Sequence, residues 1–186
     1  NFSATIIKFS GDIVILYHME IKNKIKDSGI IQLDLADFKP KIELVGIDLS
    51  SRLYQGFILK EKDFRDWLKE HDWKLYEEKA VFIFCSVDAI IPTWAYMLVM
   101  SKLLPFSEDV IVGSQIDLEK KLIQQNMASL DLSLFKEQRV IVKGCSDITS
   151  PEYAMSELVG VLQPVVKSLM YGEPCSTVPV FKKKKP

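Results

Sequence analysis

The stretch that decides the fold is Val81-Phe-Ile-Phe-Cys-Ser-Val-Asp-Ala-Ile-Ile-Pro92, which leads into an apolar run ending at Leu104. Its first four residues are all apolar, which is typical of a β-strand covered on both faces. Proline is favoured at the start of a helix because its missing N–H would have no partner there. The stretch therefore predicts a buried strand, a short loop and a buried helix that begins at Pro92.

Strands and helices alternate along the rest of the chain. The apolar patterns predict strands at 31–35, 42–49, 81–84, 109–113 and 139–142, and helices at 60–71, 92–104 and 118–127, with a helical turn near Asp131. Residues 53–59 fit either class, because Gly56 weakens both. This alternation predicts an α/β fold: a single domain with a mixed, mainly parallel sheet and helices on both faces.

The two ends of the chain are expected to differ from the domain between them. Residues 1–18 contain no methionine, so we expect an upstream extension there and a single domain over residues 19–181. Met19–Ser28 fits a short helix that Gly29 ends. The last helix is predicted from Pro151 to about Tyr171, with a kink or break at Pro164, and Gly172 ends it before an extended tail. Residues 182–186 are predicted to be a disordered basic tail.

Composition narrows the class of protein. The chain has 186 residues, 48% of them hydrophobic and 26% charged, as in soluble globular proteins. A net charge of −1 gives no reason to expect a nucleic-acid partner. The sequence contains no run of about twenty apolar residues, which is the length that a membrane-spanning helix needs. Three cysteines cannot all pair within one chain, which favours reduced thiols in the cytoplasm.

The three cysteines are the candidate functional residues. Cys85, Cys145 and Cys175 are each followed by serine, and the first two come directly after strand-like runs. An aspartate, Asp88 or Asp147, follows each of these two within three residues. Ligands bind at the carboxyl edge of a parallel sheet, and a helix N-terminus beside a thiol favours the thiolate. We therefore expect the three sulfurs to converge at that edge.

Three functions stay open on this pattern, and the sequence does not decide whether the chain is an enzyme. The first is a metal-binding accessory protein, in which the three thiolates bind zinc or an iron–sulfur cluster and Asp88 or Asp147 assists. The second is a thiol-dependent redox or transferase enzyme with Cys85 or Cys145 as the nucleophile. The third is an interaction module with packed cysteines, which presents Trp73 or the basic tail to another protein.

Four stretches carry a family resemblance: Ser28-Gly-Ile-Ile-Gln-Leu-Asp-Leu35, Gln55-Gly-Phe-Ile-Leu-Lys-Glu-Lys-Asp-Phe-Arg65, Asp88-Ala-Ile-Ile-Pro-Thr-Trp-Ala-Tyr96, and Leu162-Gln-Pro-Val-Val-Lys-Ser-Leu-Met-Tyr-Gly-Glu-Pro-Cys-Ser-Thr-Val-Pro179. Through them the chain resembles an uncharacterised bacterial family, the domain of unknown function 2480 (DUF2480). The resemblance runs from about Met19 to the lysine tail. It implies a start near Met19, and it implies no activity, substrate or catalytic residue.

Overall fold

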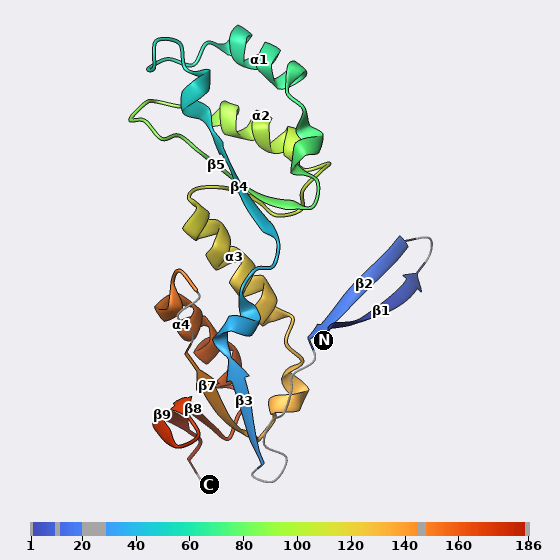
Figure 1. Cartoon of the computed structure of the whole chain (residues 1–186), viewed down its shortest axis with the longest axis vertical. Helices are drawn as coiled ribbons and strands as arrows, with labels where there is room; N and C mark the ends of the chain where they lie inside the picture. The colour runs from blue at the N-terminus through green and yellow to red at the C-terminus, as the bar shows by residue number, and fades with distance from the viewer. Residues whose placement is uncertain (1, 10–11, 20–28, 145–147, 185–186) are drawn as a thin grey trace. The chain divides into compact units, whose positions relative to one another are not determined.

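The structure, a computed structural model, describes residues 2–9, 12–19, 29–144 and 148–184. Its contacts divide the chain into two compact units, which are described one at a time. Unit 1 comprises Asn1–Phe38 and Asn126–Pro186, and unit 2 comprises Lys39–Gln125. Figure 1 shows the elements of both units. That the chain is a single domain stays a prediction.

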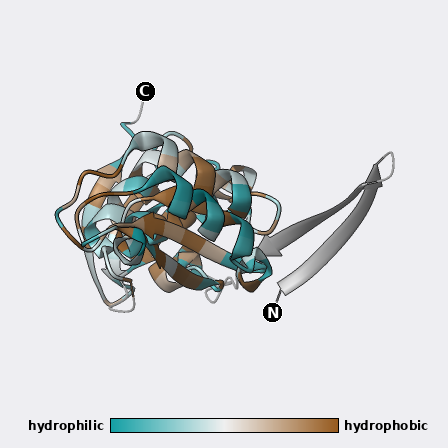
Figure 2. Cartoon of the chain, turned by 90° about the horizontal axis from the view of Figure 1, so that it is seen from above, coloured by the Kyte–Doolittle hydropathy of each residue, from teal (hydrophilic) through white to brown (hydrophobic). Residues whose placement is uncertain are grey.

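Unit 2 is built on a parallel sheet with the strand order β4-β5-β6. Its strands are β4 (Glu43–Asp48), β5 (Lys79–Phe84) and β6 (Val110–Val112). The helices are α1 (Glu61–Glu70), α2 (Thr93–Leu103) and all but the last turn of α3 (Gln115–Ala128), which continues into unit 1; the short 3-10 helices are η2 (Leu49–Arg52) and η3 (Trp73–Tyr76). Figure 2 shows that the helices alternate between hydrophobic and hydrophilic stretches, as half-buried helices do.

Helices cover both faces of this sheet. Successive residues of a strand point to opposite faces, so neighbouring residues of β5 contact different helices. Val81 and Ile83 of β5 belong to a core cluster with residues of α1 and α2. Ala80 lies on the other face, in a cluster with Leu118 and Leu122 of α3. The continuous apolar run in β5 is thus explained by burial on both sides, as predicted.

Unit 1 holds the second sheet, with the strand order β3-β7-β8-β9. Its strands are β3 (Ile30–Asp34), β7 (Arg139–Lys143), β8 (Ser168–Glu173) and β9 (Ser176–Lys182). The first three run parallel, and β9 pairs antiparallel with β8. Two 3-10 helices, η1 (Leu35–Phe38) and η4 (Leu132–Phe135), and the helix α4 (Pro151–Leu162) complete it. Ala154, Leu158 and Leu162 form the buried side of α4.

Near the N-terminus, β1 (Phe2–Phe9) and β2 (Asp12–Met19) form an antiparallel hairpin. Met19 ends β2, and the rest of the helix predicted at 19–28 lies outside the described residues. The ambiguous segment at 53–59 is a tight turn, in which Tyr54 bridges Ile58 and both Gln55 and Gly56 have positive φ. The α/β class with mixed, mainly parallel strand pairing is confirmed. The strands are divided between two sheets and the hairpin.

The last helix was predicted wrongly. It ends at Leu162 instead of Tyr171, and residues 168–173 form the strand β8. Pro164 has no N–H for a helical hydrogen bond, so the chain turns: the N–H groups of Val165 and Val166 both donate to the carbonyl of Leu162. The next apolar residues then pair with β7, which a helix could not have done. The segment after β8 is extended, as expected, but it forms β9.

The two units repeat the same arrangement of strand, loop, helix and strand. In unit 2, Val81 of β5 pairs with Val110 of β6, and in unit 1 Val140 of β7 pairs with Leu169 of β8. Both residues of the second pair lie 59 positions after those of the first, so the two registers are the same. The prolines that follow α2 and α4, Pro105 and Pro164, obey the same offset. Residues of one unit can therefore be compared with counterparts in the other.

The repeat extends to the first strand of each sheet and to the turn before the second. Asp48 ends β4 opposite Phe84, and Asp34 ends β3 opposite Lys143, the counterpart of Phe84. Glu78 and Glu137, which precede β5 and β7 at counterpart positions, both have a φ of 58°. Unit 2 is inserted into unit 1 after η1, between β3 and β7. The first strands of the two sheets, β3 and β4, are therefore closer in the sequence than the other counterpart elements, which are 59 residues apart.

Candidate functional site

At the carboxyl edge of the sheet in unit 2, Asp48 joins the loops that come after β4 and β5. Its carboxylate accepts hydrogen bonds from the backbone N–H groups of Ser50, at 2.9 Å, and of Ser86, at 3.0 Å. The hydroxyl of Ser86 also lies 3.1 Å from that of Ser50. Asp48 caps η2 and holds the loop after β5 in place, which is a positioning role for a carboxylate at a strand end.

These hydrogen bonds determine the acidity of Asp48. Partial burial acts to raise its pKa, but the donors on Ser86 and Ser50 favour the charged form and lower the pKa from 3.8 to about 2. The carboxylate is therefore ionised at neutral pH, and its Oδ1 accepts both of these hydrogen bonds within the fold. Such a group stabilises the edge and is a poor candidate for a general base.

The predicted cysteines fall in different surroundings. Cys85 directly follows β5 and is half-buried, and its thiol donates to the carbonyl of Val87, 3.4 Å away, within its own loop. Asp88 lies further along the same loop and is exposed. Cys175 is exposed in the turn between β8 and β9, in unit 1. Cys145 and Asp147 lie outside the described residues.

Among the described residues, no three side chains of the types His, Cys, Asp and Glu are grouped as metal ligands would be. The three-cysteine site for zinc or an iron–sulfur cluster stays a prediction, since Cys145 and Asp147 are not described. Its test is the metal content of protein purified without chelator, compared with Cys145→Ala.

The 59-residue offset pairs Cys85 with Gly144, and it pairs Cys145 with Ser86. The two Cys-Ser motifs are thus one position out of step with the structural repeat.

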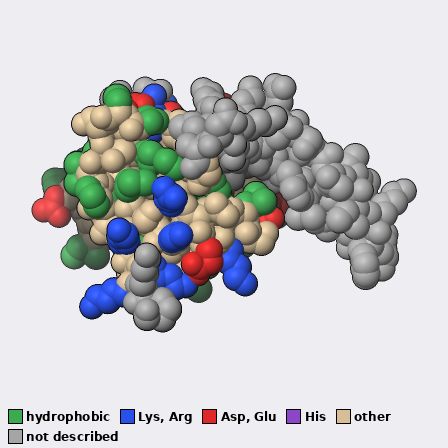
Figure 3. Space-filling model, turned by 90° about the horizontal axis from the view of Figure 1, so that it is seen from below, with side chains coloured by type: hydrophobic (Ala, Val, Ile, Leu, Met, Phe, Trp, Pro, Cys, Tyr) green, Lys and Arg blue, Asp and Glu red, His purple; other side chains and the backbone are tan. Residues whose placement is uncertain are grey.

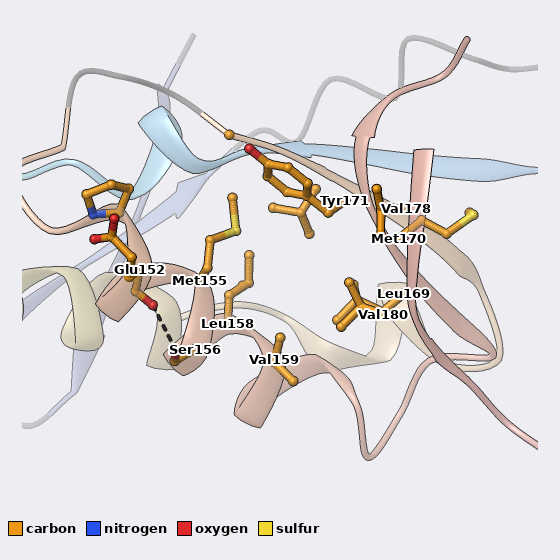
Figure 4. A pocket seen from close by; sticks show the side chains of 13 residues that line it. Glu152, Met155, Ser156, Leu158, Val159, Leu169, Met170, Tyr171, Val178 and Val180 are labelled. Carbon is orange, nitrogen blue, oxygen red and sulfur yellow. Dashed lines mark hydrogen bonds between the residues drawn. The ribbon is translucent and has the colours of Figure 1, made fainter. Parts of the chain in front are cut away.

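Unit 1 contains a pocket between α4 and the strands β7, β8 and β9, with a volume of about 680 Å³. Figure 4 shows α4 on one side and the β8–β9 hairpin on the other. The described residues that line the pocket are mainly apolar: Val142, Gly144, Pro151, Glu152, Met155, Ser156, Leu158, Val159, Leu169, Met170, Tyr171, Val178 and Val180. A pocket of this size and character is typical of sites for small molecules.

Few polar groups face this pocket. Ser156 uses its hydroxyl to donate to the backbone carbonyl of Glu152, at 2.8 Å. The carboxylate of Glu152 and the hydroxyl of Tyr171 are the other polar side-chain groups of the described lining. In Figure 4 both lie toward the same end of the pocket, and Val159, Leu169 and Val180 lie toward the other. The pocket therefore has an apolar end and a hydrogen-bonding end.

Tyr171 and Gly144 shape the polar end together. A Cβ atom on Gly144 would lie 2.5 Å from the Tyr171 hydroxyl oxygen and 2.9 Å from a ring carbon, so the tyrosine ring occupies the space that glycine leaves. In unit 2 the counterparts are Cys85, larger than the glycine, and Val112, smaller than the tyrosine. The two combinations are complementary in size, and only unit 1 places an aromatic hydroxyl at this position.

The helix residues differ in the same way. Met155 of α4 lines the pocket, whereas its counterpart in α2 is Tyr96, a partly buried residue packed against the core of unit 2. Burial, with the Cys85 thiol nearby, raises the pKa of Tyr96. The flexible thioether in unit 1 replaces a rigid ring and leaves adaptable space.

The sequence pattern did not reveal this pocket, because the helix predicted over Pro151–Tyr171 would have removed its wall. One available signal was the repeat itself. The segment around Pro164 copies the segment around Pro105, after which a strand was predicted and is found. Applied to unit 1, the same spacing predicts a strand over 169–171.

Comparison with known proteins adds the family. A family model described as a protein of unknown function (DUF2480) matches residues 19–183. No curated protein and no solved structure matches the chain. None of the helices in the described ranges is long and apolar enough to cross a membrane. Since the family model covers most of its length, the chain belongs to the DUF2480 family.

Proposed function

We propose that this protein binds an uncharged, apolar small molecule in the pocket of unit 1, with the apolar body between α4 and the β8–β9 hairpin. The observation that carries the proposal is the pocket itself, about 680 Å³ in volume and lined mainly by aliphatic side chains. Ligand pockets of roughly 300–1,000 Å³ with few polar groups are the usual form of small-molecule sites.

The charge of the lining selects the ligand class. Its described residues include one acidic side chain, Glu152, and no lysine, arginine or histidine. An anionic ligand would be repelled by the carboxylate and would find no positive side chain to offset that repulsion. A neutral ligand with a hydroxyl or amide N–H can donate to Glu152 and meet Tyr171 at the same end of the pocket.

The same residues favour binding over catalysis. The described lining contains no cysteine, histidine or lysine, and its serine hydroxyl already donates to a backbone carbonyl. Nucleophilic catalysis needs a nucleophile and a base within hydrogen-bond reach of each other. We therefore place the protein among binding proteins, in preference to the thiol-dependent enzyme.

The test is a titration with phenylnaphthylamine, an uncharged probe whose fluorescence rises in apolar surroundings. We expect saturable binding of one probe per chain. Val159→Trp places a large ring in the pocket and should weaken binding by about tenfold or more. Met97→Trp is the matched control: it adds the same ring to α2, at a side chain that is 67% exposed.

Equal binding by the two variants would show that the probe sits elsewhere, and an absence of saturable binding would refute the proposal outright. Both variants need a melting temperature near that of the wild type, so that a loss of binding is not a loss of folding. Val159 is only partly buried, so the added ring has room to point into the pocket.

A further inference from the structure

The amino edge of the sheet in unit 1 carries a concentration of positive charge. Three segments meet there, at residues 136–139, 165–168 and 182–184. The N–H of Glu137 donates to the carbonyl of Val165, and the N–H of Lys183 donates to the carbonyl of Lys167. These segments contain one acidic residue, Glu137, and six exposed basic residues, called here the basic edge: Lys136, Arg139, Lys167, Lys182, Lys183 and Lys184.

The lysines of the basic edge lie close together in space. Lys183 forms an ion pair with Glu137. That hydrogen bond, with the positive charges of Lys167 and Lys136, lowers the pKa of Glu137. Figure 3, seen from below, shows blue Lys and Arg side chains gathered on this face around red acidic ones. Glu137 balances only one of the six positive charges, so the basic edge is strongly positive on a chain whose net charge is −1.

At two of the counterpart positions, unit 2 carries the opposite charge. Glu77 and Glu108 stand where unit 1 has Lys136 and Lys167, and Glu78 and Asp109 adjoin them. Hydrogen bonds join these two segments: the N–H of Val81 donates to the carbonyl of Asp109 at 2.8 Å. The acidic edge, defined as Glu77, Glu78, Glu108 and Asp109, contains three exposed residues and a fourth, Asp109, that pairs with Lys121.

We infer that the basic edge of one copy of this chain docks on the acidic edge of a second copy. The opposite charges of the two edges make them electrostatically complementary. A contact between different surfaces is head-to-tail, so it leaves one free edge at each end and can extend to further copies. This inference does not depend on ligand binding in the pocket.

The test is sedimentation velocity at about 0.5 mM chain. We expect the weight-average mass to rise with concentration in about 20 mM salt. Affinity should fall by about tenfold or more in about 500 mM salt, where exposed charges are screened. A mass that stays monomeric in low salt at this concentration would overturn the inference.

Charge exchange between counterpart positions makes the test specific. Lys136→Glu with Lys167→Glu lowers the net charge of the basic edge and Glu137 from +5 to +1, and Glu77→Lys with Glu108→Lys raises that of the acidic edge from −4 to 0, so each change removes most of the attraction. Each double variant alone should remain monomeric. A mixture of the two should associate again, because the native acidic edge of the first meets the native basic edge of the second. Each substitution installs a charge that the other unit carries at the same position, so both variants should fold.

Two results would contradict docking on a second copy. Association unchanged in the double variants would place the contact elsewhere. A monomer whose melting temperature falls in both variants would point to a contact between the edges within one chain. A labelled single-stranded oligonucleotide supplies the alternative polyanion: its binding to a wild type that stays monomeric would assign the basic edge to nucleic acid and overturn the inference.

Discussion

At the scale of single residues, the carboxylates at the ends of the first strands stabilise the loops next to them. Asp48 accepts from two backbone N–H groups, in η2 and in the loop after β5. Its counterpart Asp34 accepts from that of Ala36 at 3.0 Å, and the counterpart of Ser86, Cys145, lies outside the described residues. Asp72, which caps η3, accepts from the N–H of Lys74 at 3.1 Å and offers a comparison for the effect of capping a 3-10 helix.

Replacing Asp48 by alanine should lower the free energy of unfolding by about 2 kcal/mol, because two backbone donors lose a charged acceptor. Asp72→Ala, the control, should lower it by about 1 kcal/mol, since the cap of η3 loses its bond to the N–H of Lys74. Urea unfolding monitored by circular dichroism measures both. Equal losses would mean that the bond to Ser86 adds nothing.

The same group gives a pH dependence. The pKa of Asp48 is about 2 in the folded chain, against an ordinary 3.8. The folded state therefore binds fewer protons than the unfolded state between these values. The stabilisation is fully present above about pH 4 and is lost as the pH falls toward 2. Asp48→Asn should flatten the acid limb of the melting temperature in this window, and an unchanged limb would contradict this account.

His71 should also make the folded chain less stable as the pH falls, in a range nearer neutrality. Burial, with the charge of Arg52 nearby, lowers the pKa of His71 from its ordinary 6.5, and its Nε2 lies 3.0 Å from the hydroxyl of Tyr76. The folded state thus resists protonation, and stability should fall as the pH drops below about 6.5. His71→Phe keeps the ring among Trp67 and Trp73 and should remove this dependence. Thermal melts of the wild type and of His71→Phe between pH 5 and 8 measure this pH dependence.

At the scale of elements, local sequence patterns predicted the strands and helices whose buried residues follow a regular pattern. β5 is found at its expected place because a strand buried on both faces leaves a continuous apolar run. α2 is also found there, but only one side of it is buried, at Ala95, Val99 and Leu103. The carboxyl end of β5, where Cys85 lies, was likewise predicted. β8 was missed because its apolar residues continue the helical spacing of α4, and only the pairing with β7 selects the strand. Pro164 marks a break, but its local effect does not distinguish a second helix from a strand beyond it.

The fit of Tyr171 over Gly144 predicts the effect of one methyl group. Gly144→Ala should turn the tyrosine ring aside, at a cost of about 1 kcal/mol in stability and with weaker binding of phenylnaphthylamine. Gly160→Ala is the control on α4, where a Cβ meets no atom within 4 Å and the better helix propensity should raise stability. Unchanged probe affinity in Gly144→Ala would remove Tyr171 from the site.

At the scale of the whole molecule, two units of one pattern have diverged in what they carry. Unit 2 fills the space beside α2 with an aromatic core, whereas unit 1 leaves a pocket beside α4. The sequence pattern could not predict the pocket, because its walls come from segments paired through the sheet. The predicted cysteine site and the pocket are therefore separate claims with separate tests.

The charge of the pocket predicts its selectivity. Anilinonaphthalenesulfonate, which has a similar aromatic body and a negative charge, should bind more weakly than phenylnaphthylamine. Glu152→Gln removes the carboxylate and should narrow the difference by roughly a factor of 2–5, since Glu152 is exposed. Fluorescence titrations of both probes against both proteins measure it. A preference for the sulfonate in the wild type would contradict an apolar, anion-excluding site.

The most direct test of ligand binding in unit 1 uses methionine methyl groups, which NMR resolves one by one. Met155 lines the pocket and its thioether points into it, as Figure 4 shows, whereas Met97 and Met100 lie on α2 in unit 2. On titration with phenylnaphthylamine, the methyl signal of Met155 should shift and saturate, while those of Met97 and Met100 stay in place. Shifts confined to Met97 and Met100, or no shift at all, would contradict the proposed binding function.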